Sequence, residues 1–228
     1  GGYQVFSLEP DVDDDGVEFK STYDGSLHRL SPERAVDIQC SLGADIQMVL
    51  DVCPPIPAEK RVLEIAVERT HKWAIRGRNH FLLREKSFEN ERAQFGIVQG
   101  GLDPKLRQIS AEQIVEIGFD GYAIGGLSVG ETRQEMIEPM QISADALPNQ
   151  QPRYFMGLGD PAGLVEAIAC GVDMFDCVWP TRLARHGTAL TMQGRVNLGA
   201  ARYAKSDDAI DPDFHTSLAS RWSRGYIR

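Results

Sequence analysis

Residues 171–182 form the segment of this chain that is best suited to chemistry. Two acids, Asp173 and Asp176, lie within an otherwise apolar run from Val172 to Trp179. Burying an unpaired carboxylate costs several kcal/mol, so each acid needs a reason to be there. Each is either a carboxylate satisfied by nearby backbone or an arginine, or a nucleophile or general base at the end of a barrel strand.

Basic residues follow this run directly. Arg182 and Arg185 stand three residues apart, which suits contacts with a phosphate backbone. The net charge of −9 argues against general nucleic-acid binding, but residues 181–228 hold eight Lys/Arg against four Asp/Glu. A basic section on an acidic body can mark a nucleic-acid footprint, and an ordinary charge fluctuation would also produce it.

Apolar runs alternate with helical patterns along most of the chain. The runs are nearly continuous in hydrophobicity, as is typical of parallel strands covered on both faces; they are Ile46–Asp51, Phe95–Gly100, Tyr122–Leu127, Tyr154–Gly159 and Met174–Val178. Helix signals lie between them: Ser31-Pro32 to Gly43, residues 57–86, a Ser110/Gln113 capping box closing at Gly118, and Asp160-Pro161 to Gly171. Repeated β-α units predict an α/β fold, most simply a (β/α)8 TIM barrel.

Two segments interrupt this pattern as antiparallel hairpins. They are residues 17–30, turning at Asp24-Gly25, and residues 188–198, turning at Gln193-Gly194. With five barrel strands, or six if Tyr3–Leu8 is one, the chain falls short of the eight strands of a closed barrel. We therefore expect a partial barrel over residues 1–205 that belongs to a larger barrel protein.

Polar and aromatic residues stand at the ends of the predicted strands. Because barrel active sites gather at the carboxyl ends of strands, Asp51, Gln99 and Asp176 should lie near one another. An acid and a carboxamide can hydrogen-bond the polar edge of a heterocycle, and Gly126 would let a ligand approach backbone N–H groups. Tyr3 and Met156 suit the two faces of a flat ring, although Met156 taken alone is more often a core residue and Gly125-Gly126 taken alone is more often a tight turn.

These residues belong to motifs that resemble the bacterial tRNA-guanine transglycosylases, the enzymes of queuosine biosynthesis. The motifs run from end to end of the chain and are specific in combination: Gly1-Gly-Tyr-Gln-Val5, Leu30-Ser-Pro-Glu-Arg34, Phe95-Gly-Ile-Val-Gln-Gly100, Gly118-Phe-Asp-Gly-Tyr-Ala-Ile-Gly-Gly-Leu127, Val129-Gly-Glu131, Met156-Gly-Leu-Gly159, Asp173-Met-Phe-Asp-Cys177, Pro180-Thr-Arg182 and Trp222-Ser-Arg224. The family exchanges guanine at wobble position 34 of tRNAs with a GUN anticodon for a 7-deazaguanine, which in bacteria is preQ1 (7-aminomethyl-7-deazaguanine).

The resemblance implies roles for the matching residues. Asp176 attacks C1′ of the ribose and displaces guanine, and the incoming base resolves the covalent intermediate, as water does in retaining glycosidases. Asp51 and Gln99 read the pyrimidine edge of a base that has left the anticodon stack. The other implied substrate-binding residues are Gly1, Gly2, Tyr3, Cys53, Gly126, Leu127 and Met156. Cys53 and Val129 are of the types that the resemblance implies around the preQ1 pocket of bacterial enzymes. The implied tRNA contacts are Gly157, Leu158, Gly159, Asp160, Pro161, Ala162 and Gly163, and Thr181, Arg182, Leu183, Ala184 and Arg185.

Two features of the family are not matched. Its general acid/base is an Asp that precedes the Gly-Gly-Tyr-Gln motif, upstream of Gly1. Its Cys-x-Cys-x-x-Cys zinc motif aligns with Phe214, Thr216 and Ala219; His215 is not a ligand by motif, and the fourth ligand would lie beyond Arg228. Zinc needs about four thiolate or imidazole ligands. We therefore expect no zinc or other cofactor, with residues 206–228 as a remnant of the zinc-binding subdomain. Apolar replacement through Phe214 and Leu218 would explain the loss, and so would a decayed gene.

Composition and cysteine usage predict a cytoplasmic protein. The four cysteines have neither zinc nor disulfide-scaffold spacing, which fits a reducing compartment. No secretory or transit peptide is visible at Gly1. The sequence has no run of about 18 apolar residues, so no membrane span is expected. The family often forms homodimers, which we expect of the full-length protein.

Two other functions fit part of the sequence. A non-catalytic tRNA-binding paralogue, or a decayed fragment of the enzyme, would account for the lost zinc ligands, but the intact Asp176, Asp51 and Gln99 speak against it. An unrelated retaining glycosidase would need a second carboxylate about 5 Å from Asp176. Asp51 could fill that role, but the breadth of the motif match speaks against this interpretation.

Overall fold

The computed structural model describes residues 10–85, 91–214, 216 and 218–228. Contacts divide the chain after Asp176 into two compact units. The predicted boundary at residue 205 lies inside the second of these units. Residues on its two sides are hydrogen-bonded to each other, since the Met192 N–H donates to the Asp211 carboxylate at 2.7 Å. The origin of residues 206–228 as a zinc-subdomain remnant stays a prediction.

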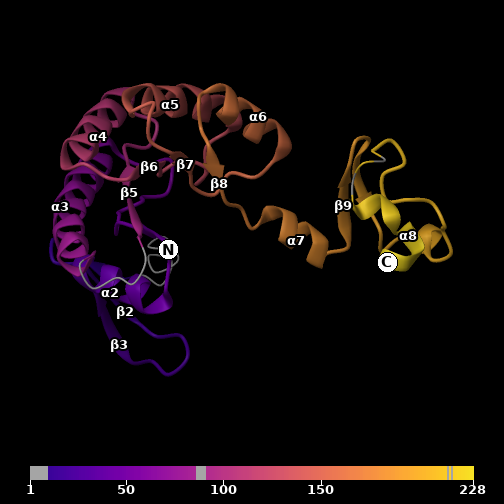
Figure 1. The fold of residues 1–228 in the computed structure, drawn as a ribbon, viewed down its shortest axis with the longest axis horizontal. Coiled ribbons are helices and arrows are strands. Elements are labelled where there is room, and N and C mark those ends of the chain that lie inside the picture. Colours follow the sequence, from indigo (N-terminus) through magenta and orange to yellow (C-terminus); the bar gives the residue numbers. More distant parts are fainter. Residues whose placement is uncertain (1–9, 86–90, 215, 217) are drawn as a thin grey trace. The chain divides into compact units, whose positions relative to one another are not determined.

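The first unit is built on a five-stranded parallel sheet. Its strands, in spatial order, are β4 (Ile46–Met48), β5 (Ala93–Val98), β6 (Gly121–Ile124), β7 (Arg153–Phe155) and β8 (Met174–Phe175). The sheet curls, and its outer side is covered by helices α2 (Pro32–Leu42), α3 (Lys60–Glu85), α4 (Pro104–Ile117), α5 (Arg133–Ala146) and α6 (Pro161–Ala169) (Figure 1). The predicted α/β class and partial TIM barrel are therefore confirmed.

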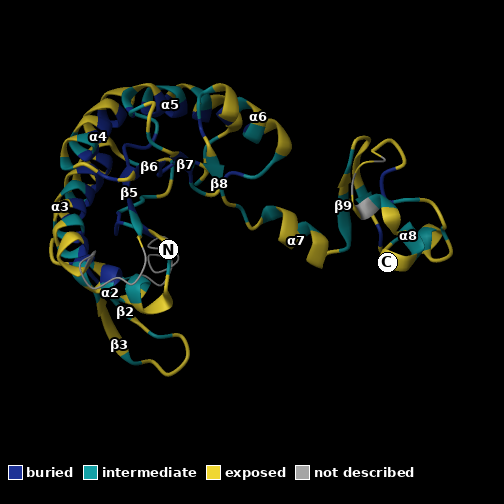
Figure 2. Ribbon diagram, in the orientation of Figure 1, coloured by how far each residue is buried: buried dark blue, intermediate teal, exposed yellow. Residues whose placement is uncertain are grey.

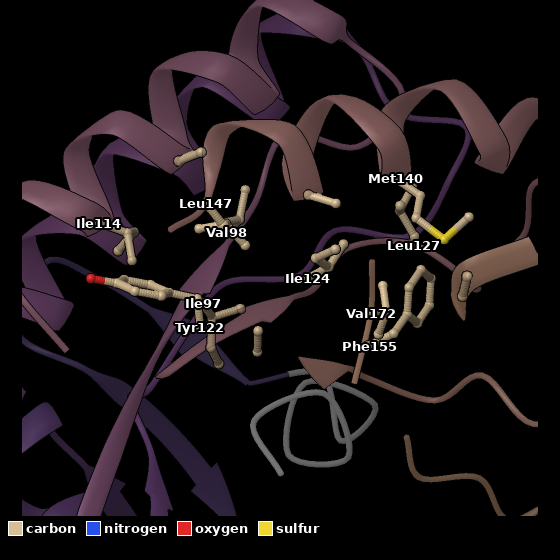
Figure 3. Close-up of a cluster of buried hydrophobic side chains, with 14 of the residues drawn as sticks. Ile97, Val98, Ile114, Tyr122, Ile124, Leu127, Met140, Leu147, Phe155 and Val172 are labelled. Atoms are coloured by element: carbon tan, nitrogen blue, oxygen red, sulfur yellow. The ribbon is translucent and has the colours of Figure 1, made fainter. Parts of the chain in front are cut away.

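Buried apolar side chains join the sheet to its helices. Ile97, Tyr122 and Phe155 from the strands, and Ile114 and Met140 from the helices, are at most 1% exposed (Figure 3). Strands packed in this way need apolar residues at successive positions, which explains the continuous runs in the sequence. Each such side chain contributes roughly 1.5–3 kcal/mol by its burial.

The strands end earlier than the sequence predicted. Asp51 and Gln99, expected at strand ends, lie in the loops that follow β4 and β5. Gly100, Gly126 and Gly157 adopt φ angles of 133°, 65° and 84°, which lie outside the β region. The chain turns at these glycines, so the candidate site residues stand on loops at the carboxyl edge of the sheet.

Several helix boundaries follow the predicted caps. The Ser31 side chain caps α2, and Gly43, with a φ of 73°, ends it. Asp160 caps α6 ahead of Pro161, and the helix ends at Ala169, followed by the C-cap Cys170 and by Gly171 with a φ of 86°, as predicted.

The capping box predicted at Ser110 and Gln113 is wrong. Helix α4 begins six residues earlier, at Pro104, where the Asp103 side chain accepts from two backbone N–H groups. Ser110 lies inside the helix and is buried, and its hydroxyl accepts the backbone N–H of Gln99 at 2.9 Å. This side chain therefore serves a loop of the sheet instead of a helix end.

The two predicted hairpins are present. In the first unit, β2 (Val17–Lys20) pairs antiparallel with β3 (Leu27–Leu30), and β1 (Asp11–Val12) pairs with β2. In the second unit, β9 (Thr188–Thr191) and β10 (Gly194–Asn197) join at Met192-Gln193, one residue before the predicted turn. The strand suggested at Tyr3–Leu8 lies outside the described residues.

The second unit is small and largely exposed (Figure 2). Besides its hairpin it contains α7 (Trp179–Arg185), the 3-10 turns η1 (Ala201–Tyr203) and η2 (Leu218–Arg221), and α8 (Arg224–Ile227). Among the residues of this unit whose burial the structure describes, Leu198, Ile210 and Asp211 are buried. Across the residues that the structure describes, no helix is long and apolar enough to cross a membrane.

Candidate active site

A cavity of about 650 Å³ lies at the carboxyl ends of the parallel strands. Its walls come from α2 and from the loops after β4, β6, β7 and β8. The predicted site residues that line it are Asp51, Cys53, Gly126, Leu127, Met156, Gly157 and Asp176. Gly1, Gly2 and Tyr3 lie outside the described residues, so their predicted roles stay predictions.

Asp51 and Gln99 form a buried polar pair. The Gln99 Nε2 group donates to Asp51 Oδ2 at 2.6 Å, and the two residues are 1% and 7% exposed respectively. Burial raises the pKa of Asp51 to about 6, against the opposing effect of the Gln99 hydrogen bond. Asp51 lines the cavity and Gln99 fixes its carboxylate, so the pair can present hydrogen-bonding groups to a polar ligand edge.

Asp176 is held in place by two donors on a neighbouring strand and its loop. The Tyr154 hydroxyl donates to Asp176 Oδ1 at 2.6 Å, and the Gly157 N–H donates to the same oxygen at 2.9 Å. Burial raises the pKa of Tyr154, and the hydrogen bond to Asp176 raises it further, so the phenol stays protonated. Asp176 itself is exposed at the cavity wall. A fixed carboxylate at a cavity wall suits nucleophilic attack.

Asp173 has a different role. Its Oδ2 atom accepts the backbone N–H of Arg153 at 2.9 Å, at the start of β7. This is the backbone-satisfied carboxylate that the sequence left open as one of two explanations. Of the two acids in the apolar run, Asp176 alone lines the cavity.

Tyr154 is a site residue that sequence reasoning missed. It was assigned to a buried strand, and its hydroxyl gave no separate signal. Its position two residues before Met156 was the available clue, because alternate residues of a strand face the same side. Both side chains line the cavity.

Main-chain groups of a glycine loop supply another wall. Gly125, Gly126 and Leu127 line the cavity, and a Cβ atom at position 126 would collide with the Gln99 side chain. The Glu131 carboxylate accepts the N–H groups of Ser128 and Val129, which closes the loop. Only glycine allows the loop to approach Gln99 in this way.

Cys53 lines the cavity as a neutral thiol. Burial raises its pKa to about 12, and the negative charge of Asp51 adds to the effect. A thiol with such a pKa is a packing group at neutral pH, since the reactive form is the thiolate. Cys53 therefore shapes the cavity.

The predicted tRNA contacts lie in both units. In the first unit, Leu158 is buried in the core, and Asp160 accepts the Gly163 N–H at 3.0 Å as a helix cap. In the second unit, Arg182 and Arg185 are exposed in the last turn of α7. Residues three apart on a helix face the same side, so the two guanidinium groups can act together on an anion.

The residues at the zinc-motif positions do not fit a zinc ion. Phe214 and Thr216 offer a phenyl ring and a hydroxyl where thiolates are needed. Phe214 and Leu218 are 49% and 75% exposed, so they do not form an apolar replacement for the metal. His215 lies outside the described residues, and among the described ones no three His, Cys, Asp or Glu side chains gather as metal ligands.

Metal analysis of the purified protein is expected to find well under one zinc per chain. The physical reason is the donor set, because hydroxyl and apolar side chains cannot replace three thiolates. A chelator should leave the thermal unfolding midpoint unchanged, since no metal would be removed. Stoichiometric zinc that survives dialysis would contradict this expectation.

The fold and the position of the cavity define a (β/α)-barrel protein whose candidate site lies at the carboxyl ends of its strands. A family model described as queuine tRNA-ribosyltransferase matches residues 1–228. The chain belongs to this family.

Three similar proteins carry the name queuine tRNA-ribosyltransferase. The protein of Thermotoga neapolitana is 50% identical over 228 residues, that of Halothermothrix orenii 46% over 231, and that of Zymomonas mobilis 46% over 229. Each match covers 100% of this chain and 60%, 60% and 59% of the respective relative. The chain therefore spans about three fifths of the length of the curated relatives that it matches.

Proposed function

We propose that the intact protein containing this chain is a tRNA-guanine transglycosylase of queuosine biosynthesis. It exchanges guanine for preQ1 at wobble position 34 of tRNAs with a GUN anticodon. Family membership supports action on tRNA, and the fixed Asp176 carboxylate at the cavity wall is the single observation that carries the mechanism. The protein acts in the cytoplasm, and as a homodimer when full length.

The reaction proceeds through two displacements at C1′ of the ribose. The Asp176 carboxylate forms a bond to C1′ while the C1′–N9 bond breaks, and guanine leaves with the electron pair and takes up a proton. By the family resemblance, that proton comes from an acid upstream of Gly1. The N9 nitrogen of preQ1 then attacks C1′, gives up its proton and releases the carboxylate.

The cavity supplies groups that suit a flipped purine. Asp51 can accept from the donors on the pyrimidine edge, and Gln99, bonded to it at 2.6 Å, holds it in place. The Gly126 N–H and the Leu127 carbonyl add main-chain contacts, while Met156 covers one ring face and Tyr3 the other. Arg182 and Arg185 contact phosphates beside the wobble base, and the 157–163 segment contacts the anticodon loop.

Covalent trapping on a denaturing gel tests this function. The intact protein is incubated with a GUN-anticodon tRNA and a 7-deazaguanine base. A tRNA-shifted protein band supports the transglycosylase. Absence of the band with tRNA still retained on a filter would favour a non-catalytic tRNA-binding paralogue, for which the loss of the zinc thiolates is the favouring observation. Neither band nor binding would indicate a decayed enzyme.

Tyr154→Phe is expected to lower kcat about tenfold and to leave the KM for guanine nearly unchanged. The change removes one of the two donors to Asp176 Oδ1, so the nucleophile loses orientation while the base contacts remain. Steady-state guanine exchange measures both constants. Tyr122→Phe is the matched control, because the Tyr122 hydroxyl is also hydrogen-bonded: it accepts the backbone N–H of Phe119 within the core. An unchanged kcat in Tyr154→Phe would contradict the assigned role.

A further inference from the structure

Arg107 is a fully buried cation that the proposed mechanism does not use. Its side chain is 0% exposed, and among the described residues no carboxylate forms an ion pair with it. Removing a guanidinium from water without a counter-ion costs several kcal/mol unless its donors are satisfied. Burial lowers the pKa of Arg107 to about 9, so it remains a cation at neutral pH.

Arg107 donates hydrogen bonds to main-chain carbonyls in the loops that follow β5 and β6. Its Nε donates to the Gly101 carbonyl at 2.8 Å, in the loop after β5. Its Nη1 donates to the Gly125 carbonyl at 2.6 Å and its Nη2 to the Gly126 carbonyl at 3.0 Å, in the loop after β6. The planar guanidinium therefore ties together two loops that follow adjacent strands.

A second polar group lies one helical turn further along α4. The Ser110 hydroxyl accepts the backbone N–H of Gln99 at 2.9 Å. Arg107 and Ser110 share the buried face of α4, as residues three apart do. One face of this helix thus fixes the backbone at Gln99, whose side chain holds Asp51, and at Gly126, which lines the cavity.

We propose that Arg107 is a positioning residue for base recognition, which holds the Gly125–Leu127 loop so that its main-chain groups face the ligand. This inference rests on the proposed function and assigns a role to a residue that does not touch the ligand. A glycine loop has no side chains to fix its conformation, so external hydrogen bonds must do so. Two bonds from one rigid, charged group, to the Gly125 and Gly126 carbonyls, meet that need, and a third ties the group to Gly101.

The test compares two buried arginines in the intact protein. Arg153 also lies in the first unit, is 9% exposed, and donates to the Leu147 carbonyl at 2.6 Å, away from the cavity lining. Arg107→Met and Arg153→Met each leave buried carbonyls without donors, so both should lower the thermal unfolding midpoint. Guanine affinity, measured by titration calorimetry, separates them.

Arg107→Met is expected to weaken guanine binding by about tenfold or more, and Arg153→Met by less than about twofold. Arg107→Lys should lie between wild type and Arg107→Met, because an ammonium cannot reach three carbonyls with fixed geometry. Retention of tRNA on a filter should be equal in all variants. If Arg107→Met does not fold, the comparison of Arg107→Lys with Arg153→Lys decides in the same way.

Two results would overturn the inference. One is an Arg107 variant that binds guanine as wild type does, and the other is an Arg153 variant that loses guanine affinity equally. Failure of the proposed function looks different, since wild-type protein would then bind guanine without exchanging it into tRNA. Wild-type protein that binds no guanine would contradict both.

Discussion

Asp176→Asn is expected to abolish the covalent tRNA band and to lower guanine exchange by roughly three orders of magnitude or more. Asparagine has the shape of aspartate, and its oxygen can still accept from the Tyr154 hydroxyl and the Gly157 N–H. The cavity should therefore keep its geometry and its affinity for the free base. A neutral amide cannot form the ester-like bond to C1′, so the chemistry alone is lost.

Asp173→Asn is the matched control for this experiment. The two acids lie three residues apart, but the Asp173 carboxylate accepts the backbone N–H of Arg153 at 2.9 Å, and Asp173 is not among the residues that line the cavity. An amide oxygen can accept that hydrogen bond, so trapping and exchange should persist near wild-type levels. A covalent band that survives in Asp176→Asn would contradict the assignment of Asp176 as the nucleophile. So would a band lost equally in both variants.

These two acids also mark the limit of what sequence alone could predict. The apolar run identified both as unusual, and strand periodicity placed them near a sheet edge. It could not say which one faces backbone and which one faces a cavity, because that depends on pairing with the neighbouring strand. In the structure, Tyr154 of β7 is paired in register with Met174 of β8, which brings the Tyr154 hydroxyl to Asp176.

The fold was predictable because its signals are local. Buried parallel strands need continuous apolar runs, and caps such as Ser31 and Asp160 satisfy helix N-termini within three residues. Ser110 shows the opposite case. It resembles a cap by type and spacing, but its partner, the Gln99 N–H, comes from the loop after β5, eleven residues away.

The supporting residues of the site were not predictable for the same reason. Arg107 reads as an ordinary helical arginine, since nothing in its neighbours along the chain indicates burial. Its partners Gly125 and Gly126 stand eighteen and nineteen residues further on, in another β-α unit. Residues that would contact a ligand can be predicted from motifs in the sequence. Residues that hold those groups in place can be identified only once the packing is known.

Guanine affinity is expected to fall as the pH drops below about 6. Burial raises the pKa of Asp51 from 3.8 to about 6, so the carboxylate takes up a proton over this range. In the proposed function, ionised Asp51 accepts charge-assisted hydrogen bonds from the donors of guanine, which protonated Asp51 cannot do. If only the ionised form binds well, the dissociation constant rises about tenfold per pH unit below 6. Calorimetric titration between pH 4.5 and 7.5 measures this.

Protonation of Asp51 should affect stability in the opposite direction: it weakens guanine binding but stabilises the fold. Between pH 4 and 6 the folded protein holds a proton on Asp51 that the unfolded chain has released. The free energy of unfolding therefore decreases as the pH rises through this window, by up to about 3 kcal/mol. Guanine binding strengthens over the range in which this contribution to stability is lost.

Asp51→Asn separates the two effects from every other titrating group. Asparagine keeps the size of the side chain and a carbonyl oxygen for Gln99, but it does not ionise. The variant should bind guanine weakly and with little pH dependence, and its stability should lack the decline between pH 4 and 6. The difference between variant and wild type isolates Asp51, because all other groups are shared. If both proteins show the same pH dependence in binding and in stability, Asp51 is not the buried acid that reads the base.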